Sequence, residues 1–380
     1  MKAIHFFARM FGLAILCLSA TITKAQVQQL AGFHTTGTEY EQAAISTFED
    51  VTVVAYQKPD KNIRLISYVV STTGKVTEQG GINADKANDV NVLMLNKNKV
   101  ILVRNTTGGK QSVSLYARTN GGSWVFNNTW NGPSIKNYKP GVARLSDDSF
   151  ATGVALSSGA LRVTTFKTAI GGNFPSTEYL VKKADSDHGG VFNIKLLTLS
   201  ANRIVAGVQL GDNQAKLICF DLGNNLSITR RGDQVLSGTI KSMCMAKMSA
   251  SNLSTWNIDG SNRLDATTFK VNSSGNFIQT DYDNDIPIPG TVPTQFYQLK
   301  AIDGHYVGNG KMLLCGLLTS DKLSVIPFKI NSEGKMHVES GAFTSSDKCN
   351  RTFAARIGDG KLIAASRLMT NKYRVAVFKW

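Results

Sequence analysis

The sequence predicts an all-β protein built of seven small antiparallel sheets, and three observations support this prediction. A pattern of an aliphatic residue, an aromatic residue and a glycine turn recurs about every 50 residues. Each repeat has room for four short strands, and helical periodicity is absent after residue 26. The 380 residues are 42% hydrophobic and 18% charged, so the chain can form a real core and is not a disordered or fibrous protein.

Residues 1–25 have the layout of a secretory signal peptide. A positively charged start is followed by the apolar stretch Met10–Ala20 and by the small residue Ala25. The apolar stretch is too short to span a bilayer, and Leu16 stands before Cys17 where a lipoprotein signal needs a small residue. We expect cleavage before Gln26 and export to the periplasm or the exterior. The remaining residues 26–380 carry a formal net charge of +12 and contain no integral membrane segment.

Each repeat is recognised by an aromatic anchor on its third strand. The anchors are Tyr68, Tyr116, Phe166, Phe220, Phe269, Phe328 and Phe378. An aliphatic side chain precedes each anchor by three residues: Leu65, Val113, Val163, Leu217, Ala266, Val325 and Val375. A glycine follows by six residues in five repeats: Gly74, Gly122, Gly172, Gly275 and Gly334. In the fourth repeat we expect Asn224 and Asn225 to supply the positive-φ turn.

The other strands follow from the same repeat. Two hairpin-linked strands precede each anchor strand, most clearly at residues 92–95 and 99–103, 142–145 and 149–155, and 355–357 and 361–365. An outer strand follows each glycine. The last repeat stops at Trp380 after its third strand, and the strand-like residues 26–33 are expected to supply its outer strand. Pro327 lies inside an anchor strand, where a missing backbone donor predicts a bulge.

Four-stranded units repeated radially describe a β-propeller. Seven anchors predict seven blades of four-stranded antiparallel sheet, about 51 residues each, in the single domain of residues 26–380. We expect the N-terminal strand to close the ring by joining the C-terminal blade, which removes an exposed sheet edge. Six or eight blades remain open, because the boundary at residues 281–300 is the weakest.

The chain resembles secreted bacterial seven-bladed β-propellers over residues 26–380, at the level of architecture. It contains no Trp-Asp dipeptide and no kelch-type glycine pair. Residues 117–124 resemble the Asp-box turn of sialidases: Gly121 and Trp124 fit, whereas Ala117 and Thr119 replace its Ser and Asp. In that family the box is a folding element away from the active site. The resemblance therefore implies a scaffold and no particular activity.

The predicted ligand site lies on the loops between blades, because binding residues accumulate on loops held by a rigid ring. Its residues are Tyr138, Lys139, His188, Lys241, Tyr297 and Arg351. Around one channel they would form a basic mouth for a glycan, an acidic polysaccharide or an envelope protein, since cations pair with carboxylate or sulfate and tyrosine stacks on sugar rings. The same residues would also suit an ordinary solvated surface. Nucleic acid is not expected, because the positive charge is dispersed along an exported chain. We expect a monomer.

Two alternatives to a non-catalytic binding protein remain open. The first is a lyase acting on an uronic-acid or sulfated polysaccharide, in which His188, Tyr297 and Arg351 would act as base, acid and carboxylate-binding cation. The second is a scaffold for protein–protein interaction. No GxSxG, HExxH or Walker motif is present.

No cofactor or metal site is expected. Asp281, Asp283 and Asp285 begin like a calcium loop, but Ile286 replaces its glycine and the twelfth position has no glutamate. We interpret this segment as a charged outer strand that discourages edge pairing and leave calcium open. Arg231-Gly232-Asp233 spells an integrin-binding tripeptide, which we interpret as coincidence in a predicted outer strand.

The four cysteines of residues 26–380 are expected to be buried thiols. Cys219, Cys244, Cys315 and Cys349 lie in or beside apolar runs, as buried free thiols do. They include no CxxC pair, which argues against zinc. A single disulfide remains open, since an oxidising compartment permits one.

Overall fold

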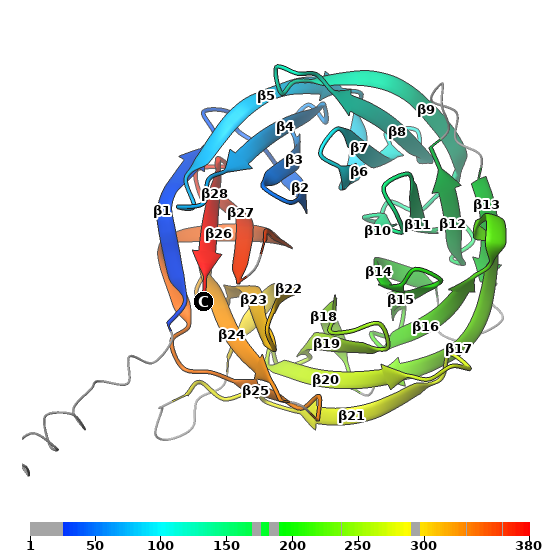
Figure 1. The fold of residues 1–380 in the computed structure, drawn as a ribbon, viewed down its shortest axis with the longest axis vertical. Coiled ribbons are helices and arrows are strands. Elements are labelled where there is room, and N and C mark those ends of the chain that lie inside the picture. Colours follow the sequence, from blue (N-terminus) through cyan, green and yellow to red (C-terminus); the bar gives the residue numbers. More distant parts are fainter. Residues whose placement is uncertain are drawn as a thin grey trace, which may run out of the picture.

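The computed structural model describes residues 26–168, 176–181, 190–236, 238–289, 297–331, 333–358 and 360–380. Within these ranges the chain is all-β, with no α-helix and one 3₁₀ helix at Asn224–Leu226. Antiparallel sheets stand around a central axis, each with one strand near the axis and others further out (Figure 1). This radial arrangement is the propeller architecture that the repeat predicts.

Five of the sheets have four strands each, ordered along the chain from the innermost strand outward. Sheet 1 contains β2 (Gln42–Phe48), β3 (Val51–Gln57), β4 (Ile63–Val70) and β5 (Val76–Ala84). Sheet 2 contains β6 (Ala87–Asn96), β7 (Lys99–Thr106), β8 (Lys110–Arg118) and β9 (Trp124–Ser134). Sheet 3 contains β10 (Gly141–Arg144), β11 (Ser149–Ala155), β12 (Leu161–Lys167) and β13 (Ser176–Val181). Sheet 4 contains β14 (Val191–Ser200), β15 (Arg203–Leu210), β16 (Ala215–Leu222) and β17 (Ile228–Leu236). Sheet 5 contains β18 (Ile240–Lys247), β19 (Asn252–Asp259), β20 (Leu264–Val271) and β21 (Phe277–Asp283).

The remaining strands form one open eight-stranded sheet with β1 and β22 at its ends. Its strands are β22 (Leu299–Gly308), β23 (Lys311–Leu318), β24 (Lys322–Ile330), β25 (Met336–Val338), β26 (Phe343–Arg356), β27 (Lys361–Leu368), β28 (Tyr373–Lys379) and β1 (Gln28–Thr35). The long strand β26 joins two meanders, because residues 343–348 pair with β24 and residues 349–356 pair with β27. Strand β1 pairs antiparallel with β28, next to which residues 26–33 were expected.

The aromatic anchors are the buried core of the third strands. All seven lie on β4, β8, β12, β16, β20, β24 and β28, and none is more than 3% exposed. Burying such a ring contributes about 1.5–3 kcal/mol. The turns after the anchors need positive φ: Gly74, Gly122, Gly275 and Gly334 have φ between +82° and +86°. In the fourth repeat the positive-φ residues are Asn225 and Leu226, so the expected turn lies one residue later. Gly172 lies outside the described residues.

The apolar cores lie between the sheets. In the described part of the chain, seven clusters of buried side chains each span two neighbouring sheets or meanders. Leu65 of sheet 1 shares a cluster with Tyr116 of sheet 2. Tyr56 of sheet 1 packs edge-on against Tyr373 of β28, with ring centroids 5.3 Å apart. Each sheet therefore depends on its two neighbours for burial of its faces.

Buried amide side chains also link neighbouring sheets. Gln57, Asn105 and Gln209 end or nearly end the second strands of their sheets, eleven residues before an anchor, and each is at most 2% exposed. They donate to backbone carbonyls at or just before the next inner strand: Gln57 to Ala87 at 2.5 Å, Asn105 to Lys136 at 2.9 Å, and Gln209 to Ile240. These bonds fix where the next sheet begins.

The bulge expected at Pro327 is not found in the β23–β24 ladder, so this prediction was wrong. Pro327 lies opposite Leu313 in regular register. Instead the outer partner of β24 changes around it: residues 322–325 pair with β26 and residues 328–330 pair with β25. Proline has no N–H to donate to a neighbouring strand, and the outer partner of β24 changes at this residue.

Replacing Gln57 with leucine is expected to lower the free energy of unfolding by about 1–3 kcal/mol, because the buried Ala87 carbonyl loses its side-chain donor. Urea unfolding should show a lower midpoint at an unchanged slope. The matched control is Gln279→Leu on the exposed face of β21, which should change stability by less than about 0.5 kcal/mol. Equal midpoints for the two variants would show that the amide link does not stabilise the fold.

Candidate functional site: the central channel

Seven of the described strands line a cavity near the central axis. These inner strands are β2, β6, β10, β14, β18, β22 and the second half of β26, and the cavity between them has a volume of about 580 Å³. A smaller cavity of about 180 Å³ adjoins it. Both are lined by Asn91, Lys139, Lys195, Asp303 and Phe353, a belt that we call the neck. The two cavities together are called the channel.

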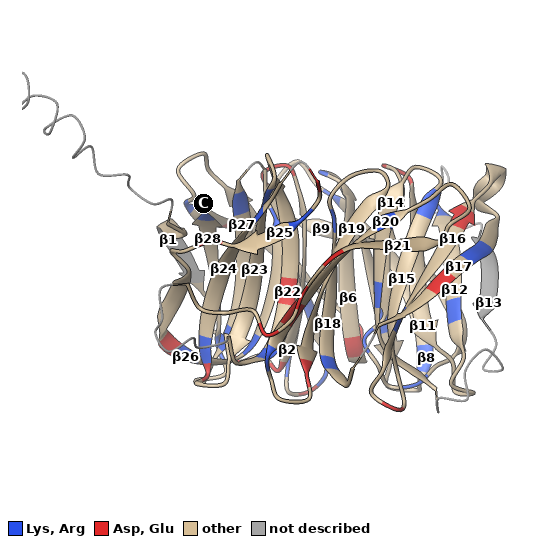
Figure 2. Cartoon of the chain, turned by 90° about the horizontal axis from the view of Figure 1, so that it is seen from below, with Lys and Arg blue, Asp and Glu red and all other residues tan. Residues whose placement is uncertain are grey.

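The inner strands run in one direction, which gives the channel two different ends. Asn91 donates to the Pro140 carbonyl at 2.8 Å and Asn96 donates to the Asp147 carbonyl at 3.2 Å, so β6 and the segment around β10 are parallel. The larger cavity reaches Lys247 and Arg356 at the C-terminal ends of their strands. The wide end of the channel therefore lies toward the rim opposite the inter-blade loops. Charged residues of both signs occupy both rims (Figure 2).

Each inner strand pairs with another strand of its sheet on one side only. On its other edge, polar side chains form hydrogen bonds with its backbone groups. The Met94 N–H donates to the Ser46 hydroxyl at 2.9 Å, and the Ala354 N–H donates to Asp303 Oδ2 at 3.1 Å. The hydroxyls of Thr47 and Thr198 donate to the carbonyls of Arg356 and Arg144. Backbone groups left without partners would be costly, so these contacts explain many of the polar residues in the wall.

Asp303 and His305 on β22 form a polar pair in the channel wall. His305 Nε2 lies 3.0 Å from the Ala354 carbonyl and 3.6 Å from Asp303 Oδ1. Because a carbonyl only accepts, Nε2 carries the hydrogen in this contact. Burial opposes ionisation of Asp303, but Lys195, His305 and the Ala354 N–H outweigh it and hold the pKa of this carboxyl well below its usual range. Asp303 therefore carries a negative charge at the neck at neutral pH.

Lys139 places an ammonium group at the neck. Its Nζ lies 4.3 Å from the centre of the Phe353 ring and 3.4 Å from the Ala43 carbonyl, a long contact for a hydrogen bond. Burial, followed by repulsion from Lys195, lowers the pKa of Lys139 to about 8 despite the attraction of Asp89 and Asp303. The ammonium group thus keeps donors that no strong partner in the described chain occupies.

Cations outnumber carboxylates among the described residues that line the larger cavity. The cations are Lys139, Lys195, Lys247 and Arg356, which also donates to the Gly358 carbonyl, and the carboxylate is Asp303. Within the described part of the chain, the ammonium groups of Lys195 and Lys247 form no hydrogen bond and no close ion pair. Such a wall attracts an anion, and the confined geometry strengthens that attraction relative to an open surface.

One of the six predicted ligand residues lines the channel, and a second lies near enough for its charge to act on it. Lys139 lines the neck, and the charge of Arg351 acts on it from β26. Tyr138 is exposed, with its ring 5.8 Å from that of Phe192. Lys241 is exposed at the start of β18, where its Nζ donates to Asn262 Oδ1 at 3.0 Å.

The other predicted residues do not extend this group. Tyr297 is buried in the apolar cluster between sheet 5 and β22–β25, and burial raises the pKa of its hydroxyl to about 12. It lines a separate cavity of about 460 Å³ with Gln298 and Ser324. His188 lies outside the described residues. Tyr297 is not among the described residues that line the channel, so the expected grouping of His188, Tyr297 and Arg351 gains no support.

Sequence reasoning missed Lys195, Asp303 and His305. All three lie inside inner strands, whereas the predicted site was placed on the loops between blades. A signal was present: Lys195 lies within Val191–Ser200, and Asp303 and His305 lie within Leu299–Gly308, among apolar residues of both strands. A charge in a first strand of a radial repeat is expected to face the axis, because the other positions pack against neighbouring sheets.

The three aspartates of the calcium-like segment contact different partners. Asp281 accepts the Met336 N–H at 3.0 Å, and Asp285 accepts from Arg263 at 2.7 Å. Burial, followed by the charge of Asp281, raises the pKa of Asp283. No group of three or more His, Cys, Asp or Glu suited to a metal ion is found among the described residues.

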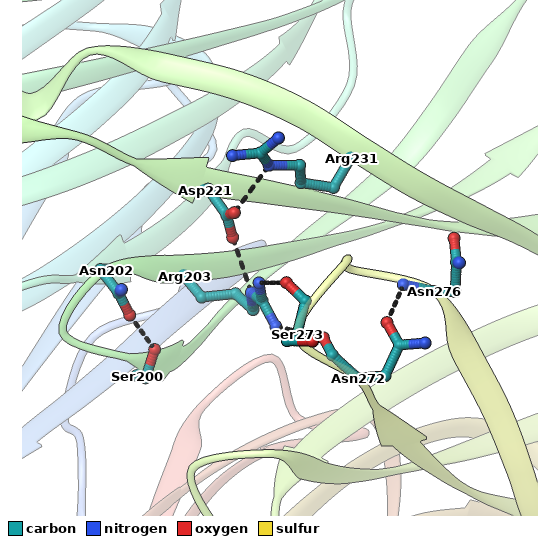
Figure 3. A network of polar contacts seen from close by, with 8 residues as sticks. All are labelled: Ser200, Asn202, Arg203, Asp221, Arg231, Asn272, Ser273 and Asn276. Atoms are coloured by element: carbon teal, nitrogen blue, oxygen red, sulfur yellow. Dashed lines mark hydrogen bonds and ion pairs between the residues drawn. The ribbon is translucent and has the colours of Figure 1, made fainter.

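Arg231 of the Arg-Gly-Asp tripeptide is part of a polar network on sheets 4 and 5 (Figure 3). Arg231 donates to Asp221 Oδ2 at 2.7 Å, and Arg203 donates to Asp221 Oδ1 at 2.7 Å. Arg203 also donates to the carbonyls of Asn272 at 2.6 Å and Ser273 at 2.9 Å, which links sheet 4 to the β20–β21 turn. Burial disfavours the charge of Asp221, but the two arginines lower the pKa of its carboxyl overall. Arg231 thus shares Asp221 with Arg203, the residue that links the two sheets.

The chain has the fold of known propellers, without a detectable family. No protein-family model and no curated protein sequence matches it. The WD40 domain of Toxoplasma gondii coronin is similar with a TM-score of 0.56 at 10% identity, over 94% of this chain and 88% of that one. Sqt1 of Saccharomyces cerevisiae gives 0.51 at 10% identity, over 91% and 98% of the two chains. The six-bladed fucose-recognising lectin of Aleuria aurantia gives 0.51 at 14% identity, over 81% and 99%. At these identities the similarity extends to the fold alone. No helix in the described residues is long and apolar enough to cross a membrane.

The four thiols are free and buried, as the sequence indicates. Burial raises the pKa of Cys219 and Cys349 to about 11 and that of Cys315 to about 12. Since the thiolate is the reactive species, iodoacetamide at pH 8 should leave the native protein of residues 26–380 unmodified. In guanidinium chloride without reductant, mass spectrometry should find all four alkylated. Two thiols that react only after reduction would reveal a disulfide and contradict the structure.

Proposed function

We propose that this protein is an exported, non-catalytic β-propeller that binds an acidic glycan in its central channel. The observation that supports this most directly is the charge of the wall: four cationic side chains face one carboxylate around a cavity of about 580 Å³. Ammonium and guanidinium groups recognise carboxylate and sulfate, the charged groups of acidic polysaccharides. The proposed ligand can also be a component of the cell envelope that carries carboxylate or sulfate groups.

A seven-bladed ring closed by β1 is part of the same proposal. The seven apolar clusters support it, because one of them joins sheet 1 to the meander β26–β28. The pairing of β1 with β28 supports it as well, since β1 then takes the place of an outer strand. In this view the eight-stranded sheet is two blades that share β26 as a continuous strand.

The geometry favours the channel over the inter-blade loops as the binding site. Of the loop residues predicted to bind, Tyr138 and Lys241 lie outside the channel lining, and the Lys241 ammonium already has an amide partner. Lys195 and Lys247 instead line the larger cavity. A protein-binding scaffold, the function class of many propellers, would use the rims or the outer strands.

Binding of acidic polysaccharides is expected to be salt-sensitive and to depend on the wide end of the channel. Lys247→Ala should weaken binding about two- to fivefold, in line with the strength of an exposed ion pair. Lys241→Ala is the matched control, because Lys241 is an exposed lysine at the opposite end of the same strand. Glycan arrays and calorimetry at two salt concentrations provide the measurement.

Three outcomes would contradict this proposal. An affinity that does not change with salt concentration would show that the cationic wall does not bind the ligand. Loss of affinity in Lys241→Ala but not in Lys247→Ala would move the site to the inter-blade loops. Absorbance from unsaturated uronate products, lost in His305→Ala, would make the protein a lyase, since His305 is the one described histidine that lines the larger cavity.

Export is a second part of the proposal that can be tested alone. Expression of the full sequence in a bacterial host should yield a product that begins at Gln26, as N-terminal sequencing would show. The Leu13→Arg variant should retain its N-terminus and stay in the cytoplasm, because a charge then interrupts the apolar stretch. An unprocessed product that leaves the cytoplasm equally well would contradict a cleaved signal.

A further inference from the structure

Five charged groups from different segments of the chain lie at the neck or near it. Lys139 is approached by Lys195 of β14, Asp89 of β6, Asp303 of β22 and Arg351 of β26, and its Nζ also faces the Ala43 carbonyl of β2. With all five ionised there are three cations and two carboxylates, and burial raises the pKa of one of these carboxyls, Asp89. The neck thus has one positive charge more than the described chain balances.

The two carboxylates already have backbone partners, whereas the ammonium groups have donors to spare. Asp303 accepts the Ala354 N–H, and Asp89 accepts the Val90 N–H at 2.9 Å. Each ammonium group has three N–H donors. Those of Lys195 have no hydrogen-bond partner in the described chain, and Lys139 has the Ala43 carbonyl at 3.4 Å. An incoming oxygen anion therefore meets unoccupied donors without displacing an existing strong bond.

We propose that the neck is a subsite for one singly charged oxyanion, the carboxylate of an acidic sugar, held between Lys139 and Lys195 with the sugar ring against Phe353. This rests on the proposed function and specifies its ligand. A single charge fits because it neutralises the excess at the neck, while a second would meet Asp89 and Asp303. The half-buried Phe353 ring lines both cavities, and Lys139 Nζ lies 4.3 Å from its centre, so a sugar whose carboxylate contacts Lys139 lies against the part of the ring that the ammonium group leaves open.

The subsite should respond to pH in the mildly alkaline range. An anion binds the protonated form of Lys139, and burial together with the charge of Lys195 lowers the pKa of that group to about 8. Affinity is therefore full below pH 8 and falls as the pH rises above it, by at most about tenfold per pH unit for one proton. Arginine keeps its charge over this range, so Lys139→Arg should remove the pH dependence.

The test measures binding of three probes to the protein of residues 26–380 between pH 6.5 and 9.5. The probes are an oligogalacturonate, the neutral oligogalactose of equal length and an oligogalactose 6-sulfate. The wild type should bind the oligogalacturonate best, and Lys139→Ala and Lys195→Ala should each reduce affinity about tenfold or more. Lys139→Arg should bind with little change from pH 6.5 to 9.5, and Lys241→Ala should behave as wild type. Thermal unfolding of each variant shows whether the fold is kept.

The outcomes separate this subsite from the proposed function. If the wild type binds no acidic glycan, the proposed function fails and the subsite with it. If it binds but Lys139→Ala and Lys195→Ala retain wild-type affinity, the subsite is wrong and the channel proposal stands. Preference for the 6-sulfate would overturn the carboxylate assignment. A pH profile identical in Lys139→Arg and wild type would remove Lys139 from the contact.

Discussion

The free edge of each inner strand is the constraint on which the rest of this structure depends. A sheet that points its first strand at a common axis leaves one row of N–H and C=O groups without a strand partner. In this protein, side chains from the neighbouring inner strand form hydrogen bonds with that row. Ser46 accepts the Met94 N–H, and Asp303 accepts the Ala354 N–H. These contacts set the direction and height of each inner strand relative to the next. They also require polar residues at the centre of a molecule whose other strands are packed with apolar ones.

That constraint divides the polar residues of the channel into two groups. Thr47, Thr198 and Asp303 are explained by the backbone groups that they contact. Lys195 and Lys247 are not explained in this way, because neither makes a hydrogen bond within the described chain. Lys195 is partly buried and its charge acts on Asp303, while Lys247 is exposed, so neither charge is needed to hold the backbone of the wall. Such residues are better understood as binding groups, and for this reason we place the proposed function on them.

The sequence was sufficient for the architecture and insufficient for the site, for physical reasons. Anchors such as Phe166 were predictable because each is an aromatic residue that follows an aliphatic residue by three positions. This pattern lies within a single strand, so it can be found in the sequence. The buried amides Gln57, Asn105 and Gln209 lie at a fixed distance from the anchors and could have been found in the same way. The site could not, because Lys139, Lys195 and Asp303 belong to different repeats, and only the radial arrangement brings them together. Tyr297 was expected to be exposed because of its loop position, whereas the structure buries its side chain in an apolar cluster.

The most direct test of acidic-glycan binding in the channel is a crystal structure of the protein with an acidic oligosaccharide. We predict the sugar in the central channel, with one carboxylate within hydrogen-bond distance of the ammonium groups of Lys139 and Lys195. A sugar bound on the inter-blade loops beside Tyr138 and Lys241, with no sugar in the channel, would contradict it.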